Sequence, residues 1–130
     1  SLIPGRYAFA TAESYLGDYY GAMDALCLVS ELEGFGLVVL EAMMCERPVI
    51  VSSVGCVPQV VNDRINGLVV RGDVASITEA AMLLRNHPQW SRGIPAEGHL
   101  YATQHGHAWH MARKYEDLLE TLWMQRSIGV

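Results

Sequence analysis

Three short, uninterrupted apolar runs separate helix-like segments, and this alternation constrains the fold more than any other feature of the chain. The runs are Ala25–Val29, Pro48–Ser52 and Leu68–Arg71. Runs of four to eight apolar residues without polar alternation are typical of strands covered on both faces, as in parallel sheets. We therefore predict an α/β fold with a three-layer, Rossmann-like parallel sheet that has helices on both faces.

The segments between these runs carry helix signals. Tyr15–Met23 repeats an apolar side chain every four residues, Leu37–Cys45 is apolar nearly all round and is read as a short buried helix, and Ala75–Arg85 follows Asp73, a good N-cap residue. Residues 86–98 contain two prolines and two glycines, so we expect a loop there, broken by a short helix. The remaining predicted elements are a strand at Arg6–Ala10, a helical turn at Gln59–Val61 and a closing helix at Ala108–Arg126.

Length and charge exclude several classes of protein. The chain has 130 residues, enough for one domain but not comfortably for two. Its formal net charge is −5 and its nine basic residues form no run, which argues against a nucleic-acid partner. No apolar stretch is long enough to span a bilayer, and membrane association is not expected. Three dispersed cysteines, Cys27, Cys45 and Cys56, favour reduced, buried thiols and a cytoplasmic location.

Four histidines gather before the last predicted helix. They are His99, His105, His107 and His110. Their spacing could suit a metal ion, but no acidic or cysteine partner is nearby, so a polar loop or a helix cap is favoured and no metal site is expected.

The segment Ser30–Met43 runs from a predicted strand through a glycine loop into a predicted helix. Ligands of open α/β sheets bind at the carboxyl ends of the strands, and a helix N-terminus favours phosphate. Gly34 and Gly36 have no Cβ, so the backbone there can approach a ligand closely. The segment indicates an anion or nucleotide site, with a tight structural turn as the alternative.

Glu41 sharpens this interpretation. It lies about one turn into an otherwise apolar helix, where a carboxylate needs a partner or a cleft. Two ribose hydroxyls could donate hydrogen bonds to it. The alternatives are a Glu41 that faces solvent and a Glu41 that pairs with Arg47 at the helix end.

The seven residues between Glu33 and Glu41 resemble the Glu-x7-Glu signature of retaining GT-B glycosyltransferases of the group 1, family 4 type. Cys56, Gln59 and Arg64 depart from the residues that this family usually carries. The resemblance nevertheless covers most of the chain in one order, and it implies part of a C-terminal, donor-binding domain. The other matching segments are Tyr20–Ser30, Cys45–Ile50, Gly55–Val61, Asn66–Asp73 and Trp109–Leu119.

The resemblance implies roles for individual residues. Glu33 would be the catalytic residue near the reacting centre, and Glu41 would bind the donor ribose. The other donor-binding residues that it implies are Ser30, Gly34, Phe35, Gly36 and Leu37, the last four through their amides. Such enzymes transfer a hexose from a UDP-, GDP- or ADP-linked donor with retention and need no bound metal, and stabilising the departing diphosphate would be the main electrostatic task.

The chain lacks parts that the family normally has. Two strand–helix units with a basic pair for the diphosphate are absent, as is the acceptor-binding N-terminal domain. We therefore expect residues 1–130 to form one partial nucleotide-sugar-binding domain, an incomplete half that is inactive alone and depends on a missing N-terminal domain or a partner chain. The chain opens on Ser1 rather than methionine, so upstream sequence is expected.

The missing units would leave Ala25–Val29 with an open apolar edge. We expect either Arg6–Ala10 or a second copy, in a homodimer, to cover it. Three other functions stay open: a non-catalytic nucleotide-binding or protein-interaction module, a relic without an independent role, and a sugar epimerase on the same fold. The Glu33–Glu41 spacing argues against the epimerase.

Overall fold

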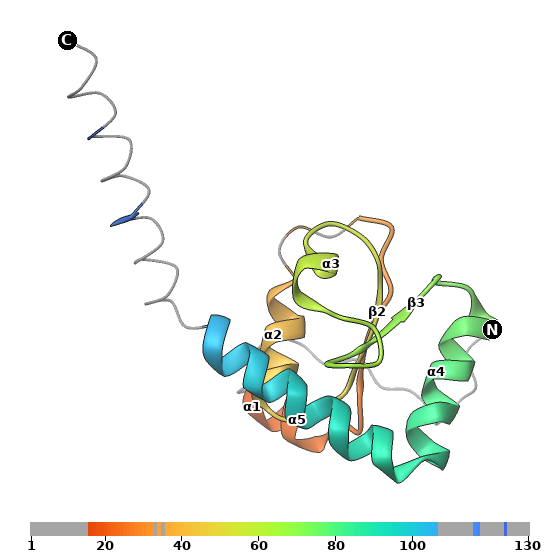
Figure 1. Ribbon diagram of the computed structural model, residues 1–130. Helices are drawn as coiled ribbons and strands as arrows, with labels where there is room; N and C mark the ends of the chain where they lie inside the picture. Colours follow the sequence, from red (N-terminus) through yellow and green to blue (C-terminus); the bar gives the residue numbers. More distant parts are fainter. Residues whose placement is uncertain (1–15, 33, 35, 107–115, 118–123, 125–130) are drawn as a thin grey trace.

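A three-stranded parallel sheet forms the centre of the computed structural model, which describes residues 16–32, 34, 36–106, 116–117 and 124 (Figure 1). Its strands are β1 (Leu26–Leu28), β2 (Val49–Ser52) and β3 (Leu68–Val70), in the order β1-β2-β3. Cys27 pairs with Ile50, and Ile50 pairs with Leu68. The α/β class and the parallel sheet are confirmed, with each strand one or two residues shorter than predicted.

Helices cover both faces of the sheet and make three layers. Because successive strand residues point to opposite faces, Val49 and Val51 pack in a core with α1, α2, α3 and the end of α5. On the other face, Ile50, Leu68 and Val70 pack with α4 and the first half of α5. The helices are α1 (Leu16–Ala22), α2 (Leu37–Met44), α3 (Val57–Val60), α4 (Val74–Asn86) and α5 (Pro88–His105).

Asp73 caps α4, as predicted. Its Oδ1 accepts a hydrogen bond of 2.7 Å from the Ser76 amide. This hydrogen bond, and then the one from the Arg71 guanidinium, lower the pKa of the Asp73 carboxyl.

Helix α5 corrects one prediction. The sequence predicts a loop broken by a short helix over residues 86–98, but the chain is helical without a break from Pro88 to His105. Pro88 lies in the first turn, where a missing N–H costs no hydrogen bond. A Cβ on Gly98 would lie 3.1 Å from the Asn66 carbonyl oxygen and 3.2 Å from Met43 Cγ, so glycine suits the close contact between α5 and α2. Burial of this helix face outweighs the low helix propensity of glycine and proline.

Two elements are less buried than the sequence predicted. All four residues of β2 are buried, whereas Cys27 in β1 is exposed and its neighbours in the strand are half-buried. Strand β1 is an edge strand, and within the described part of the chain nothing pairs with its outer side. Helix α2 buries only one side, and Leu37, Val38 and Met44 are exposed.

Some predicted elements lie outside the described residues. These are the strand at Arg6–Ala10 and most of the helix at Ala108–Arg126, of which residues 116–117 and 124 are described and helical. None of the helices in the described ranges combines the length and apolar character that a bilayer crossing needs.

Candidate functional site

A hollow of about 660 Å³ lies where the three strands end. Residues 29–31 line it after β1, residues 52–54 at the end of β2, and residues 70–72 at the end of β3. This carboxyl end of a parallel sheet is where α/β proteins bind ligands. Ser30, a predicted donor-binding residue, therefore lines a hollow at the end of the sheet where the sequence predicts that a ligand binds.

Ser52 fixes the path of the chain at this hollow. Its hydroxyl donates to the Ser30 carbonyl oxygen at 2.8 Å and accepts from the Ser30 amide at 2.9 Å. Only 6% of Ser52 is exposed, so both hydrogen bonds are shielded from water. The sequence analysis missed Ser52, although it is the polar residue that ends an apolar run.

Gly36 turns the chain into α2. Its φ of 67° and ψ of 36° are left-handed, which favours glycine, and its carbonyl oxygen accepts from the Val39 amide at 2.9 Å. Leu37 begins α2 with 58% of its surface exposed, and Gly34 is also exposed. Glu33 and Phe35 lie outside the described residues, so their predicted roles stay predictions.

Glu41 has a partner that the sequence did not reveal. Its Oε2 accepts a hydrogen bond of 2.6 Å from the hydroxyl of Tyr20 on α1. Tyr20 is only 7% exposed, and its burial, followed by the hydrogen bond to Glu41, raises the pKa of its hydroxyl to about 12. Tyr20 is therefore a proton donor at neutral pH, and Glu41 is half-buried and paired with Tyr20 rather than with Arg47.

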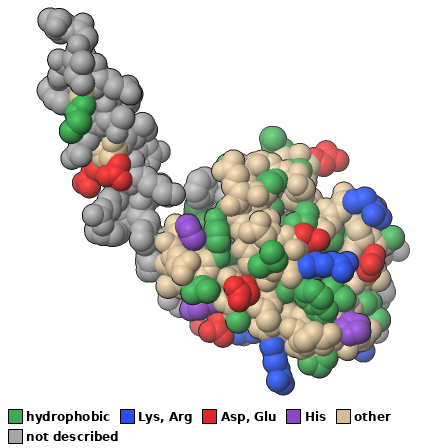
Figure 2. All heavy atoms as spheres, viewed as in Figure 1, with side chains coloured by type: hydrophobic (Ala, Val, Ile, Leu, Met, Phe, Trp, Pro, Cys, Tyr) green, Lys and Arg blue, Asp and Glu red, His purple; other side chains and the backbone are tan. Residues whose placement is uncertain are grey.

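Arg71 supplies a basic side chain at the hollow, which the sequence analysis did not foresee. Its Nε lies 2.9 Å from Asp73 Oδ2, and the side chain is 78% exposed. On the face shown in Figure 2, the Arg side chains of the described residues lie apart, with acidic side chains between them. That distribution differs from the basic stripe of a nucleic-acid-binding surface.

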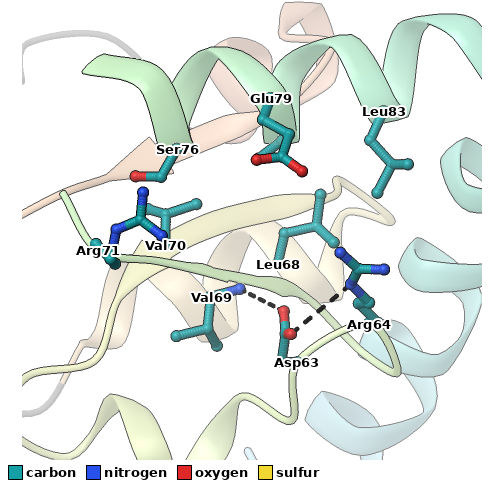
Figure 3. A pocket seen from close by; sticks show the side chains of 10 residues that line it. Asp63, Arg64, Leu68, Val69, Val70, Arg71, Ser76, Glu79 and Leu83 are labelled. Atoms are coloured by element: carbon teal, nitrogen blue, oxygen red, sulfur yellow. Dashed lines mark hydrogen bonds and ion pairs between the residues drawn. The ribbon is translucent and has the colours of Figure 1, made fainter. Parts of the chain in front are cut away.

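A smaller hollow of about 290 Å³ lies between β3 and α4 (Figure 3). Asp63 lies beside β3, where its carboxylate accepts a hydrogen bond from the Val69 amide and faces Arg64. Glu79 and Leu83 line it from α4. No predicted site residue lies in this hollow.

Two of the described histidines, His99 and His105, have ring nitrogens close to backbone carbonyl oxygens. His99 Nδ1 lies 3.0 Å from the Met44 carbonyl oxygen, and His105 Nδ1 lies 3.0 Å from that of Tyr101. Among the described side chains, no three His, Cys, Asp or Glu residues gather as metal ligands would. His107 and His110 lie outside the described residues.

The family follows from a match over most of the region that builds the sheet. The family model described as "Glycosyl transferases group 1" matches residues 5–87, which include all three strands and the hollow. The chain belongs to the group 1 glycosyltransferases. A D-inositol 3-phosphate glycosyltransferase from Frankia alni is 37% identical over 92 residues, which make up 70% of this chain and 23% of that protein. The chain thus spans about a quarter of the length of this group 1 relative.

Solved structures of glycosyltransferases share the fold. The C-terminal domain of the group 1 protein LpcC from Francisella tularensis has a TM-score of 0.67 and 27% identity, covering 75% of this chain and 51% of that domain. Anabaena HepE, solved in complex with UDP and glucose, has a TM-score of 0.73 and 22% identity, covering 79% of this chain and 29% of that protein. The likeness to HepE shows the GT-B fold of this group 1 chain.

Proposed function

We propose that this chain is the donor-nucleotide-binding part of a retaining glycosyltransferase that transfers a hexose from a nucleoside diphosphate. The observation that carries the proposal is Glu41: a half-buried carboxylate on α2, one turn beyond the left-handed Gly36, in a chain of the group 1 family. A carboxylate in this place can accept hydrogen bonds from ribose hydroxyls.

The chemistry divides among the residues of the signature segment. Glu41 binds the donor ribose. The sugar hydroxyls and the diphosphate bind at the start of α2, to the amides of Gly34, Phe35, Gly36 and Leu37. Glu33 acts near the reacting centre. Stabilising the negative charge that develops on the leaving diphosphate is the main electrostatic task, and no metal ion is required for it.

The nature of the partners is supported in part by the comparisons. HepE binds UDP and glucose in its crystal structure, which supports a nucleotide-sugar donor, UDP-linked before GDP- or ADP-linked. The chain spans 23% of the Frankia alni relative, so an acceptor-binding N-terminal domain or a partner chain has to complete the enzyme. We expect residues 1–130 to be inactive alone. The three cysteines are free, which agrees with a cytoplasmic setting.

A second candidate is a non-catalytic module that binds a nucleotide or a protein. The open edge of β1 favours it, because an unpaired strand edge is a template for another chain. Retained nucleotide binding in a chain that self-associates and has no transferase activity, even with acceptor-domain partners supplied, would support this candidate.

Calorimetric titration of the 130-residue chain with UDP, GDP and ADP tests the proposal. We expect saturable binding of one nucleotide and its loss in Glu41→Ala. Glu97→Ala is the matched control, because Glu97 is an exposed carboxylate on α5, and its binding should equal that of the wild type. A wild-type chain that binds none of the three nucleotides would refute the donor site.

A further inference from the structure

Within the described part of the chain, the hydroxyl of the buried Tyr20 makes one hydrogen bond, and its acceptor is Glu41, the carboxylate proposed to bind the donor ribose. Tyr20 is 7% exposed and lies on α1, whereas Glu41 lies on α2, 21 residues further along the chain. The two oxygens are 2.6 Å apart, the length expected of a charge-assisted hydrogen bond between a hydroxyl and a carboxylate. No second hydrogen bond to the Glu41 carboxylate comes from the described residues.

We propose that Tyr20 is a positioning residue that orients the Glu41 carboxylate for the ribose of the donor nucleotide. The proposal rests on the proposed donor function. A glutamate side chain has three rotatable torsions, and a ligand that binds it must order all of them. Tyr20 orders them beforehand by holding Oε2, which leaves Oε1 and the second lone pair of Oε2 to accept from ribose hydroxyls.

The chemistry of Tyr20 suits this role across the physiological range. A pKa of about 12 keeps the phenol protonated, so it donates to the carboxylate and never repels it as a phenolate. The tyrosine ring belongs to the core that α1 forms with α2, β2 and α5, which anchors the hydroxyl to the rigid part of the fold. Tyr20 touches Glu41 rather than the ligand, so its effect should depend on the ligand's ribose hydroxyls.

Paired titrations test this dependence. The Kd of UDP and of 2′,3′-dideoxy-UDP is measured for the wild type and for Tyr20→Phe, with the GDP and ADP pairs run in the same way. We expect the wild type to prefer the ribose form by about tenfold or more, as for a hydrogen bond to a charged group. In Tyr20→Phe this preference should fall to about threefold or less, while the Kd of the dideoxy form stays the same.

Two further variants separate positioning from packing. Tyr19→Phe removes the hydroxyl of the neighbouring, 37% exposed tyrosine and should keep the wild-type preference. Glu41→Gln should lose the preference whether or not Tyr20 is present, so the double variant Tyr20→Phe/Glu41→Gln should equal Glu41→Gln. If Tyr20→Phe does not fold, a Glu41→Gln chain that keeps the ribose preference overturns the proposal.

The outcomes distinguish this inference from the proposed function. A wild-type chain that binds no nucleotide overturns the donor site, and the role of Tyr20 with it. A wild-type chain that binds with a Glu41-dependent ribose preference, kept in Tyr20→Phe, overturns the role of Tyr20 alone. Equal weakening of both ligands in Tyr20→Phe would show a packing effect and also overturn the positioning role.

Discussion

The two edges of the sheet are finished in different ways. At the β3 edge, the amide of the central residue, Val69, donates to Asp63 Oδ1 at 2.8 Å. At the β1 edge, the Leu26 amide donates to the Pro48 carbonyl oxygen at 2.9 Å, on the side of β2. Because successive amides of a strand point to opposite sides, the amide of the central residue, Cys27, points away from the sheet. None of the described residues accepts a hydrogen bond from it. One edge is closed by the chain itself, and the other is left open by the residues that the structure describes.

The β3 edge is closed by the turn that leads into it. The Arg64 amide donates to the Gly67 carbonyl oxygen at 2.7 Å, with Arg64 in a left-handed conformation at φ 60°. Asn66 is buried and holds the turn from inside, accepting from the Asn62 amide at 2.7 Å and donating to the Val60 carbonyl oxygen at 3.0 Å. This turn places Asp63 against the outer side of β3 (Figure 3).

The difference between the two edges shows that β3, rather than β1, has the features of a natural edge strand. Natural sheets protect their edges with charged residues, bulges or covering loops, and β3 has such protection. Strand β1 has the apolar composition of an interior strand, and no turn among the described residues covers it, so we expect it to take a neighbour in the working protein.

Gly67→Ala should disrupt the closed edge. A Cβ at this position would lie 2.6 Å from Val61 Cγ1 and 2.8 Å from Val49 Cγ2, and neither branched side chain can turn away cheaply. We expect the free energy of unfolding to fall by about 2 kcal/mol, measured by urea denaturation. Gly93→Ala is the control, since no heavy atom of the described chain lies within 4 Å, and it should stabilise α5 by about 0.5–1 kcal/mol. Equal stability of the two variants would contradict the crowding at Gly67.

Asp63→Ala should open the β3 edge while the turn stays intact. It removes the acceptor of the Val69 amide, and because this hydrogen bond is exposed we expect a loss of about 0.5–1 kcal/mol. The variant should also associate more strongly than the wild type in a light-scattering concentration series. Asp63→Asn keeps an acceptor and should behave as the wild type. An Asp63→Ala chain that associates no more than the wild type would show that Asp63 does not protect this edge.

Cys27→Lys should close the open edge of β1. Because Cys27 is exposed, the free energy of unfolding should change by no more than about 0.5 kcal/mol. Sedimentation velocity under reducing conditions should show weaker self-association than in the wild type, since a lysine on an edge strand opposes pairing. Met82→Lys places the same charge on exposed α4 and should leave association unchanged. A wild-type chain that stays monomeric at high concentration would refute pairing between copies at this edge.

Acid should weaken the region after β3 by a small amount. The Ser76 amide, and then Arg71, lower the pKa of Asp73 from its ordinary value of 3.8, so its charge stabilises the fold above that value. This contribution is lost as the pH falls through the lowered pKa. The stabilities of the wild type and of Asp73→Asn, measured by urea denaturation, should therefore differ at pH 7, draw together below pH 3.8 and converge below the lowered pKa. A difference that does not depend on pH would mean that the carboxylate charge adds nothing to the cap.

The sequence predicted the order of strands and helices because local patterns determine it. The three apolar runs became β1, β2 and β3, and Asp73 caps α4 where a cap residue was expected. Helix α5 escaped prediction because the close contact that Gly98 makes with Met43 of α2 and with Asn66 joins residues far apart in the chain. The exposure of Cys27 escaped it because hydrophobicity does not reveal whether a strand has a neighbour.

The candidate site was predictable only in its outline. Strand, glycine loop and helix placed Ser30 beside a hollow and Gly36 in a left-handed turn. The side chains that hold these parts in place, Ser52 and Tyr20, come from other elements and become partners only when the chain folds. The roles of all the predicted donor-site residues, Glu33 and Phe35 among them, remain predictions.

Helix α5 lies beyond the end of the family match but inside the folded core. The family match ends at residue 87, immediately before α5 begins. Yet Ile94 of α5, 1% exposed, fills the core on one face of the sheet, and Ala102, with no exposed surface, fills the core on the other. A chain cut after residue 87 would keep the whole family match and lose a buried side chain from each core. The stretch that matches the family model is therefore shorter than the stretch that has to fold.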